Sequence, residues 1–155
     1  MIRFLISFLL VSSLSAQVFS EYPYVGVQGS AMAGSTISHS SSESGLFQNP
    51  ASITGFNDNI VMAGQANVFS QTYLPYMHLG LIYNIPIIGK MGISYQSLST
   101  EYDGKKLSSE SSFSFTKGIF LQKDKNSSLA LGLRANFLLW NQSESAGSGD
   151  GSGGF

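Results

Sequence analysis

The stretch from Leu129 to Asn141, Leu-Ala-Leu-Gly-Leu-Arg-Ala-Asn-Phe-Leu-Leu-Trp-Asn, decides how this chain folds. Every second residue from Leu129 to Leu139 is apolar, whereas the intervening positions include glycine, arginine and asparagine. A period of two predicts a β-strand with one apolar and one polar face. The stretch is longer than the usual soluble strand of about 5–6 residues and reaches the roughly 9–11 residues that a tilted strand needs to cross a bilayer. Trp140 stands near its end, where membrane strands carry interfacial aromatic residues.

Four earlier segments repeat this pattern, the first of them only weakly. They are residues 60–70, 77–85, 91–102 and 111–121. Residues 86–89, Asp103-Gly104 and residues 123–126 carry turn signals between them. Residues 59–142 are therefore predicted to form five antiparallel membrane strands. Lys117 interrupts the apolar face of its strand, so we expect it near a membrane interface or beside a bulge.

Composition favours the same class. Charged residues make up 11% of the chain, against about 25% in typical soluble domains. The formal net charge is −1, so the basic surface that nucleic acid requires is missing and no nucleic-acid partner is expected. Seventeen glycines, 12% aromatic residues and the lack of a long helical pattern indicate an all-β protein.

Residues 1–16 read as a signal peptide. Arg3 provides a positive start, an apolar run follows, and small residues ending at Ala16 form a cleavage zone. The apolar run is too short for a spanning helix, which needs about 20 residues. With no cysteine in the chain, no disulfide is expected in the compartment beyond the inner membrane.

Residues 17–58 are the least strand-like part of the chain. Glycines interrupt them, and Asn49-Pro50 predicts an extended residue followed by one short helical turn. Irregular backbone of this kind cannot face lipid, because its amides would have no partners there. We therefore expect a plug or hatch inside a barrel lumen or on the periplasmic side.

Two motifs of this segment resemble the N-terminal signature of FadL-like outer-membrane proteins, including the PorV/PorQ branch. They are Gly29-Ser30-Ala31-Met32-Ala33-Gly34-Ser35 and Ser44-Gly45-Leu46-Phe47-Gln48-Asn49-Pro50-Ala51. The resemblance covers about 30 residues and implies a plug at the periplasmic end of a barrel of about fourteen strands. It points to Gly29, Met32, Gly34, Asn49, Pro50 and Ala51 as the plug motif. Ser41-Ser42 replaces the expected acidic pair, and Ser52 replaces a glycine-like position.

The last residues, 143–155, read as a Gly/Ser-rich extracellular loop that does not lead into a further strand. Bacterial barrels have an even number of strands, at least eight, so five strands indicate the truncated N-terminal portion of a longer protein. We expect short periplasmic connections at residues 86–89 and 123–127 and longer outer ones at 71–75, at 103–108 and from 143 onward.

Residues suited to chemistry are scarce. His39 and His78 have no companions at metal-ligand spacing, and no Gly-x-Ser-x-Gly elbow is present, so neither a metal, a cofactor nor an enzyme is expected. Arg134, on the polar face of its strand, is the best candidate for a lumen group that binds a carboxylate or the plug. A strand-pairing or solvated arginine is the alternative at this position.

The sequence therefore predicts an outer-membrane β-barrel protein with the lipid bilayer as its first partner. The resemblance implies either passage of hydrophobic small molecules such as fatty acids, or handling of secreted protein cargo in a type IX-like secretion system. The alternative is a soluble periplasmic or secreted β-sandwich with a binding or structural role.

Overall fold

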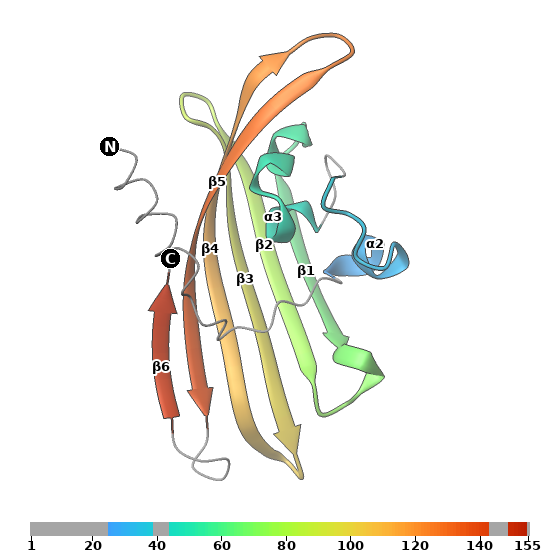
Figure 1. Ribbon diagram of the computed structural model, residues 1–155, viewed down its shortest axis with the longest axis vertical. Helices are drawn as coiled ribbons and strands as arrows, with labels where there is room; N and C mark the ends of the chain where they lie inside the picture. The colour runs from blue at the N-terminus through green and yellow to red at the C-terminus, as the bar shows by residue number, and fades with distance from the viewer. Residues whose placement is uncertain (1–24, 39–43, 143–148, 155) are drawn as a thin grey trace, which may run out of the picture.

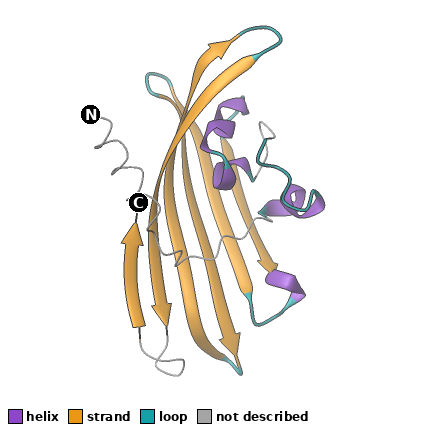
Figure 2. Ribbon diagram, viewed as in Figure 1, coloured by secondary structure: helices purple, strands orange, loops and turns teal. Residues whose placement is uncertain are grey.

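The computed structural model describes residues 25–38, 44–142 and 149–154 of the chain. Short helices come first, then a meander of long antiparallel strands (Figures 1 and 2). The helical elements are α2 (Gly26–Ala31), α3 (Gly45–Gln48), η1 (Pro50–Gly55) and η2 (Val68–Ser70). The strands are β1 (Ile60–Asn67), β2 (Pro75–Ile85), β3 (Gly89–Tyr102), β4 (Lys105–Lys123), β5 (Ser128–Gln142) and β6 (Gly149–Gly154). The expected signal peptide at 1–16 lies outside the described residues.

The five predicted strands are confirmed as β1 to β5. They lie in sequence order in one open antiparallel sheet, and β1 occupies an edge. Residues in register across the middle of the sheet include Leu79 with Tyr95, Tyr95 with Phe113 and Phe113 with Phe137. The fold is all-β with a barrel-like partial wall, as the alternation predicts.

Three expectations about the ends of the strands are wrong. Residues 149–154 form β6, which pairs with β5, because backbone pairing needs no side-chain alternation and glycine permits it. The expected outer loop at 103–108 is a two-residue hairpin, since Asp103 (φ 50) and Gly104 (φ 71) take the left-handed pair of values of a tight turn and β4 begins at Lys105. The predicted strand 60–70 ends at Asn67, and η2 follows it.

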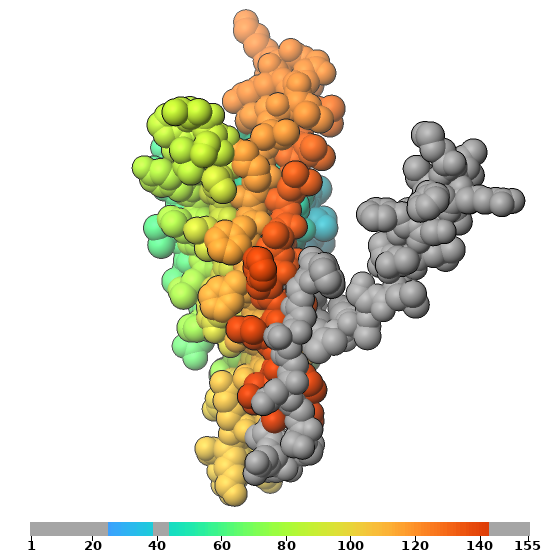
Figure 3. Space-filling model, turned by 90° about the vertical axis from the view of Figure 1, so that its left-hand side faces the viewer, coloured from blue at the N-terminus to red at the C-terminus, as the bar shows by residue number. Residues whose placement is uncertain are grey.

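The two faces of the sheet differ in polarity and in exposure. On the face turned away from the helices, which is seen in Figure 3, the apolar rows stay exposed, with Leu131 at 45%, Leu133 at 66% and Phe137 at 55%. The opposite face carries small and polar side chains, among them the buried Ser94, Ser112, Ser114 and Thr116. The outer face is thus apolar and exposed, whereas the inner face is buried and combines these polar side chains on β3 and β4 with the apolar Tyr76 and Ile82 on β2.

Trp140 falls on the polar, inward-facing row, in register with Glu110. It is partly buried and lies on the same row as Arg134, so its expected position in an outward aromatic girdle is wrong. The reason is the period of two itself, which places even-numbered residues of β5 on the inner face.

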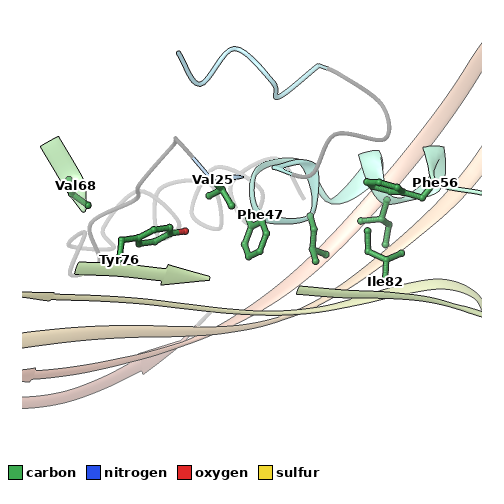
Figure 4. Packing of buried hydrophobic residues seen from close by; sticks show 8 residues of the cluster. Val25, Phe47, Phe56, Val68, Tyr76 and Ile82 are labelled. Atoms are coloured by element: carbon green, nitrogen blue, oxygen red, sulfur yellow. The ribbon is translucent and has the colours of Figure 1, made fainter. Parts of the chain in front are cut away.

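The hydrophobic core lies between the helices and the sheet. Its buried members are Val25, Leu46, Phe47, Ile53, Phe56, Val68, Tyr76 and Ile82. In Figure 4 these side chains meet in one layer, with the helical segment above and the strands below. Residues 25–38 and 44–57 therefore fill the concave side of the sheet as a plug, and we use this name for them below.

Candidate functional site: the plug seat

The part of the plug that contacts the strands is built by local hydrogen bonds around Asn49. Its Oδ1 accepts from Ala51 N at 3.1 Å and so caps η1, where Pro50 occupies the first helical position. Its Nδ2 donates to Ile37 O at 2.9 Å, and its own carbonyl accepts from Ser52 Oγ at 2.7 Å. The predicted short helical turn is confirmed, and one side chain ties it to the preceding plug segment.

Gly132 is the point where this turn meets the sheet. A Cβ built on Gly132 would overlap Ala51 N and Pro50 C and would lie 2.7 Å from Pro50 O. These are backbone atoms of the Asn-Pro-Ala motif, so they cannot move aside as the end of a side chain does. Position 132 therefore requires glycine while the plug is seated.

Three further glycines extend this seat across neighbouring strands. Leu46 reaches the space above Gly80 and Gly92, where a Cβ on Gly80 would lie 2.8 Å from Leu46 Cδ2 and one on Gly92 would overlap Leu46 Cδ1. On β4, a Cβ on Gly118 would lie 2.8 Å from both Ile53 Cγ1 and Thr54 Cγ2. We name Gly80, Gly92, Gly118 and Gly132 together the plug seat.

Arg134 fastens the plug to this seat. Its Nη1 donates to Phe47 O at 2.5 Å, its Nη2 donates to Leu46 O, and its Nε donates to Thr116 Oγ1 at 3.4 Å. Both plug acceptors are carbonyls of the short helix α3, and hydrogen bonds from a charged donor are stronger than neutral ones. Arg134 was expected to bind a carboxylate or the plug, or else to pair with a neighbouring strand; the structure shows hydrogen bonds to plug carbonyls and one to Thr116 on the adjacent strand.

The other half of the predicted plug motif lies apart from the seat. Gly29 is buried within α2, Met32 is 41% exposed at its end, and Gly34 takes a left-handed φ of 79 in the turn that follows. Besides the bond from Asn49 to Ile37, a chain of side-chain hydrogen bonds links the two halves: Ser44 Oγ donates to Thr36 Oγ1 at 2.6 Å, and Thr36 Oγ1 donates to Gln48 Oε1 at 2.9 Å. The structure thus places Asn49, Pro50 and Ala51 on the seat and leaves Gly29, Met32 and Gly34 in the outer part of the plug.

The seat glycines were visible in the sequence as small residues on the polar face, but sequence reasoning assigned them no role. Their signal is that one glycine falls on the inward row of each of β2, β3, β4 and β5. Contacts between segments so distant in sequence can be recognised only in the folded structure.

Among the described residues, no group of three His, Cys, Asp or Glu side chains is placed to hold a metal ion. Helices long and apolar enough to cross a membrane are likewise missing from the described part of the chain. The site thus offers a positioned arginine, hydroxyl groups and close backbone packing.

Comparison of the chain with family models, with curated proteins and with solved structures finds no match in any of the three.

Proposed function

We propose that this chain forms wall and plug of an outer-membrane β-barrel of the PorV/FadL type. The observation that carries the proposal is the exposed apolar outer face of the sheet: large apolar side chains are exposed there, whereas polar side chains such as Ser94 and Thr116 are buried on the inner face. In water such a surface would be a large apolar patch, which soluble proteins rarely expose. Against acyl chains it is the expected lipid-facing surface of a barrel.

Strand dimensions support the same proposal. The strands β2 to β5 contain 11, 14, 19 and 15 residues, and about 9–11 residues are enough to cross the bilayer when tilted. Exposed tyrosines lie toward both ends of the sheet, with Tyr83 at one end and Tyr73 and Tyr102 at the other. Tyrosine favours the membrane interface because its ring is apolar and its hydroxyl forms hydrogen bonds with water.

Lys117 fits a membrane surface at the plug end of the strands. It stands on the outer row of β4, in register with Met91, and its Nζ donates to Ile88 O in the turn between β2 and β3. A lysine whose stem lies along apolar surface while its ammonium reaches the interface is typical of membrane proteins.

Of the two activities that the family resemblance implies, the inner face favours handling of secreted protein cargo over passage of hydrophobic molecules. Its buried serines and threonine on β3 and β4 are polar, and the plug covers its apolar part around Tyr76 and Ile82. A route for fatty acids would need an apolar lining. Passage of hydrophobic molecules is the second candidate and depends on displacement of the plug.

The test begins with expression behind a bacterial leader, followed by membrane fractionation and detergent extraction. We expect the protein in the outer-membrane fraction, and recovery from the soluble periplasm without detergent would contradict the proposal. Pull-down of secreted proteins from the solubilised membrane, compared with fatty-acid binding by the purified protein, then separates the two activities.

A further inference from the structure

A second site lies beyond the plug seat, at the end of the sheet where the β4–β5 hairpin rises above its neighbours (Figure 1). A pocket of about 580 Å³ opens there between η1 and the tip of the hairpin. Ser52, Thr54 and Asn57 line the plug side, and Phe120, Lys123 and Lys125 line the hairpin side. We call it the rim pocket, and its volume is in the range of small-molecule sites.

The charge of the rim pocket is positive. Lys123 and Lys125 are its two cations, and Lys123 is placed over the ring of Phe120, with Nζ 4.8 Å from the ring centroid. Asp124 also lines the pocket, and its Oδ2 accepts from Gln122 Nε2 at 2.7 Å and from Ser127 Oγ at 3.5 Å. The carboxylate thus stabilises the turn, and the two lysines outnumber it in the lining of the pocket.

The surface around the rim pocket adds to its positive charge. Lys90, at the start of β3, interacts electrostatically with both Lys123 and Asp58. With Lys123 and Lys125 it makes three lysines at this end of the inner side, against the two aspartates Asp58 and Asp124. A concave site with clustered cations raises the local concentration of anions.

We propose that the rim pocket binds an anionic ligand through a phosphate or carboxylate group, held by Lys123 and Lys125 with the Ser38 hydroxyl and the Asn57 amide as donors from the plug side. Ammonium groups bind such anions as point charges, and serine and asparagine side chains provide directed donors. Because one wall belongs to the plug and the other to the sheet, a bound ligand also joins the two. The proposal does not depend on membrane insertion, since the pocket belongs to the folded chain in any medium.

Isothermal titration of the folded protein in a zwitterionic detergent at low salt tests the proposal, with inorganic phosphate and succinate as free probes. A third arm uses micelles containing phosphatidylglycerol, with phosphatidylcholine as reference, to distinguish a lipid headgroup from a free anion. We expect a Kd below about 1 mM in at least one arm, and about tenfold weaker binding for Lys123→Gln and for Lys125→Gln. Lys105→Gln, at the opposite end of the sheet, is the matched control and should bind as the wild type does.

Asn57 tests the plug-side wall without loss of a structural contact, because its side chain is exposed. Asn57→Lys should strengthen binding several-fold and Asn57→Asp should weaken it by a similar factor. The proposal is overturned if no probe binds below about 1 mM, if the Lys105 control loses as much affinity as the pocket variants, or if both Asn57 variants bind as the wild type does.

Discussion

The outer and inner faces of the sheet differ in how the exposure of a side chain relates to its polarity. On the outer face Val61 is 80% exposed and Leu133 is 66% exposed, although both are large and apolar. On the inner face Ser94 and Thr116 are 2% and 1% exposed, although both are polar. Burial in this sheet therefore follows the face on which a residue lies more than its hydrophobicity, and the contrast is explained if lipid is the solvent on one side and the plug fills the other.

The largest expected effect comes from a charge in the middle of the outer face. Leu79→Lys should lower the free energy of unfolding in vesicles by about 2–4 kcal/mol, because the middle of the strand would lie near the bilayer midplane. Val27→Lys is the matched control, since Val27 is even more exposed, at 82% against 43%, but belongs to the plug. Equal and small losses for both variants, measured by denaturant unfolding, would show that the outer face meets water.

The next largest effect comes from filling the space above a glycine on the inner face. Gly132→Val should destabilise the seated plug by about 3 kcal/mol, since the new side chain overlaps backbone of Pro50 and Ala51. Ala135→Val, on the exposed outer row of the same strand, should be neutral or slightly stabilising because valine favours strands. Hydrogen exchange, which measures the protection of the backbone amides of the plug, distinguishes these results. Full protection in Gly132→Val would mean that the close approach is absent in solution.

Arg134→Gln removes the charged donors from the carbonyls of Leu46 and Phe47. We expect a loss of about 2 kcal/mol, confined to the plug, because charged hydrogen bonds to buried acceptors are worth this much. Limited proteolysis should cut the plug faster while the strands remain intact. If cleavage rates in the plug stay at the wild-type value, Arg134 does not fasten it.

The smallest effect concerns the cap of η1. Asn49→Ala should lower the free energy of unfolding by about 1 kcal/mol, the usual value for loss of an N-cap. Asn49→Asp should keep a side-chain oxygen that accepts from Ala51 N but lose the N–H that donates to Ile37 O. Thermal unfolding of the wild type and the two variants measures this, and we expect the Tm of Asn49→Asp to lie between the other two. An Asn49→Ala protein as stable as the wild type would show that Asn49 does not stabilise η1.

The sequence was sufficient for the strands whose side chains alternate. Residues 129–141 and the segments before them predict β2 to β5 closely, because burial on one face leaves a period of two in the sequence. The pair Asn49-Pro50 likewise predicts η1, since capping and proline geometry act within a few residues. For Arg134 the polar row predicted a group that binds a carboxylate or the plug, with a strand-pairing or solvated arginine as the alternative, and the sequence alone did not decide between them.

Features without a side-chain pattern were missed. The strand β6 contains mostly glycine, and glycine carries no alternation to read. The plug seat depends on contacts such as Gly132 with Pro50, which lie far apart along the chain and are set by packing alone. The β3–β4 hairpin was expected to be longer because its polar flanking residues resemble a loop, although they pair as strand.

The central claim is that the outer face touches acyl chains, and the chain has no cysteine to complicate its most direct test. A fluorophore placed by Phe137→Cys is compared with one placed by Val27→Cys in vesicles that contain brominated lipids or are bathed in iodide. We predict that brominated lipid quenches the probe at 137 and that iodide quenches only the probe at 27. Quenching of the probe at 137 by iodide and not by brominated lipid would contradict the account.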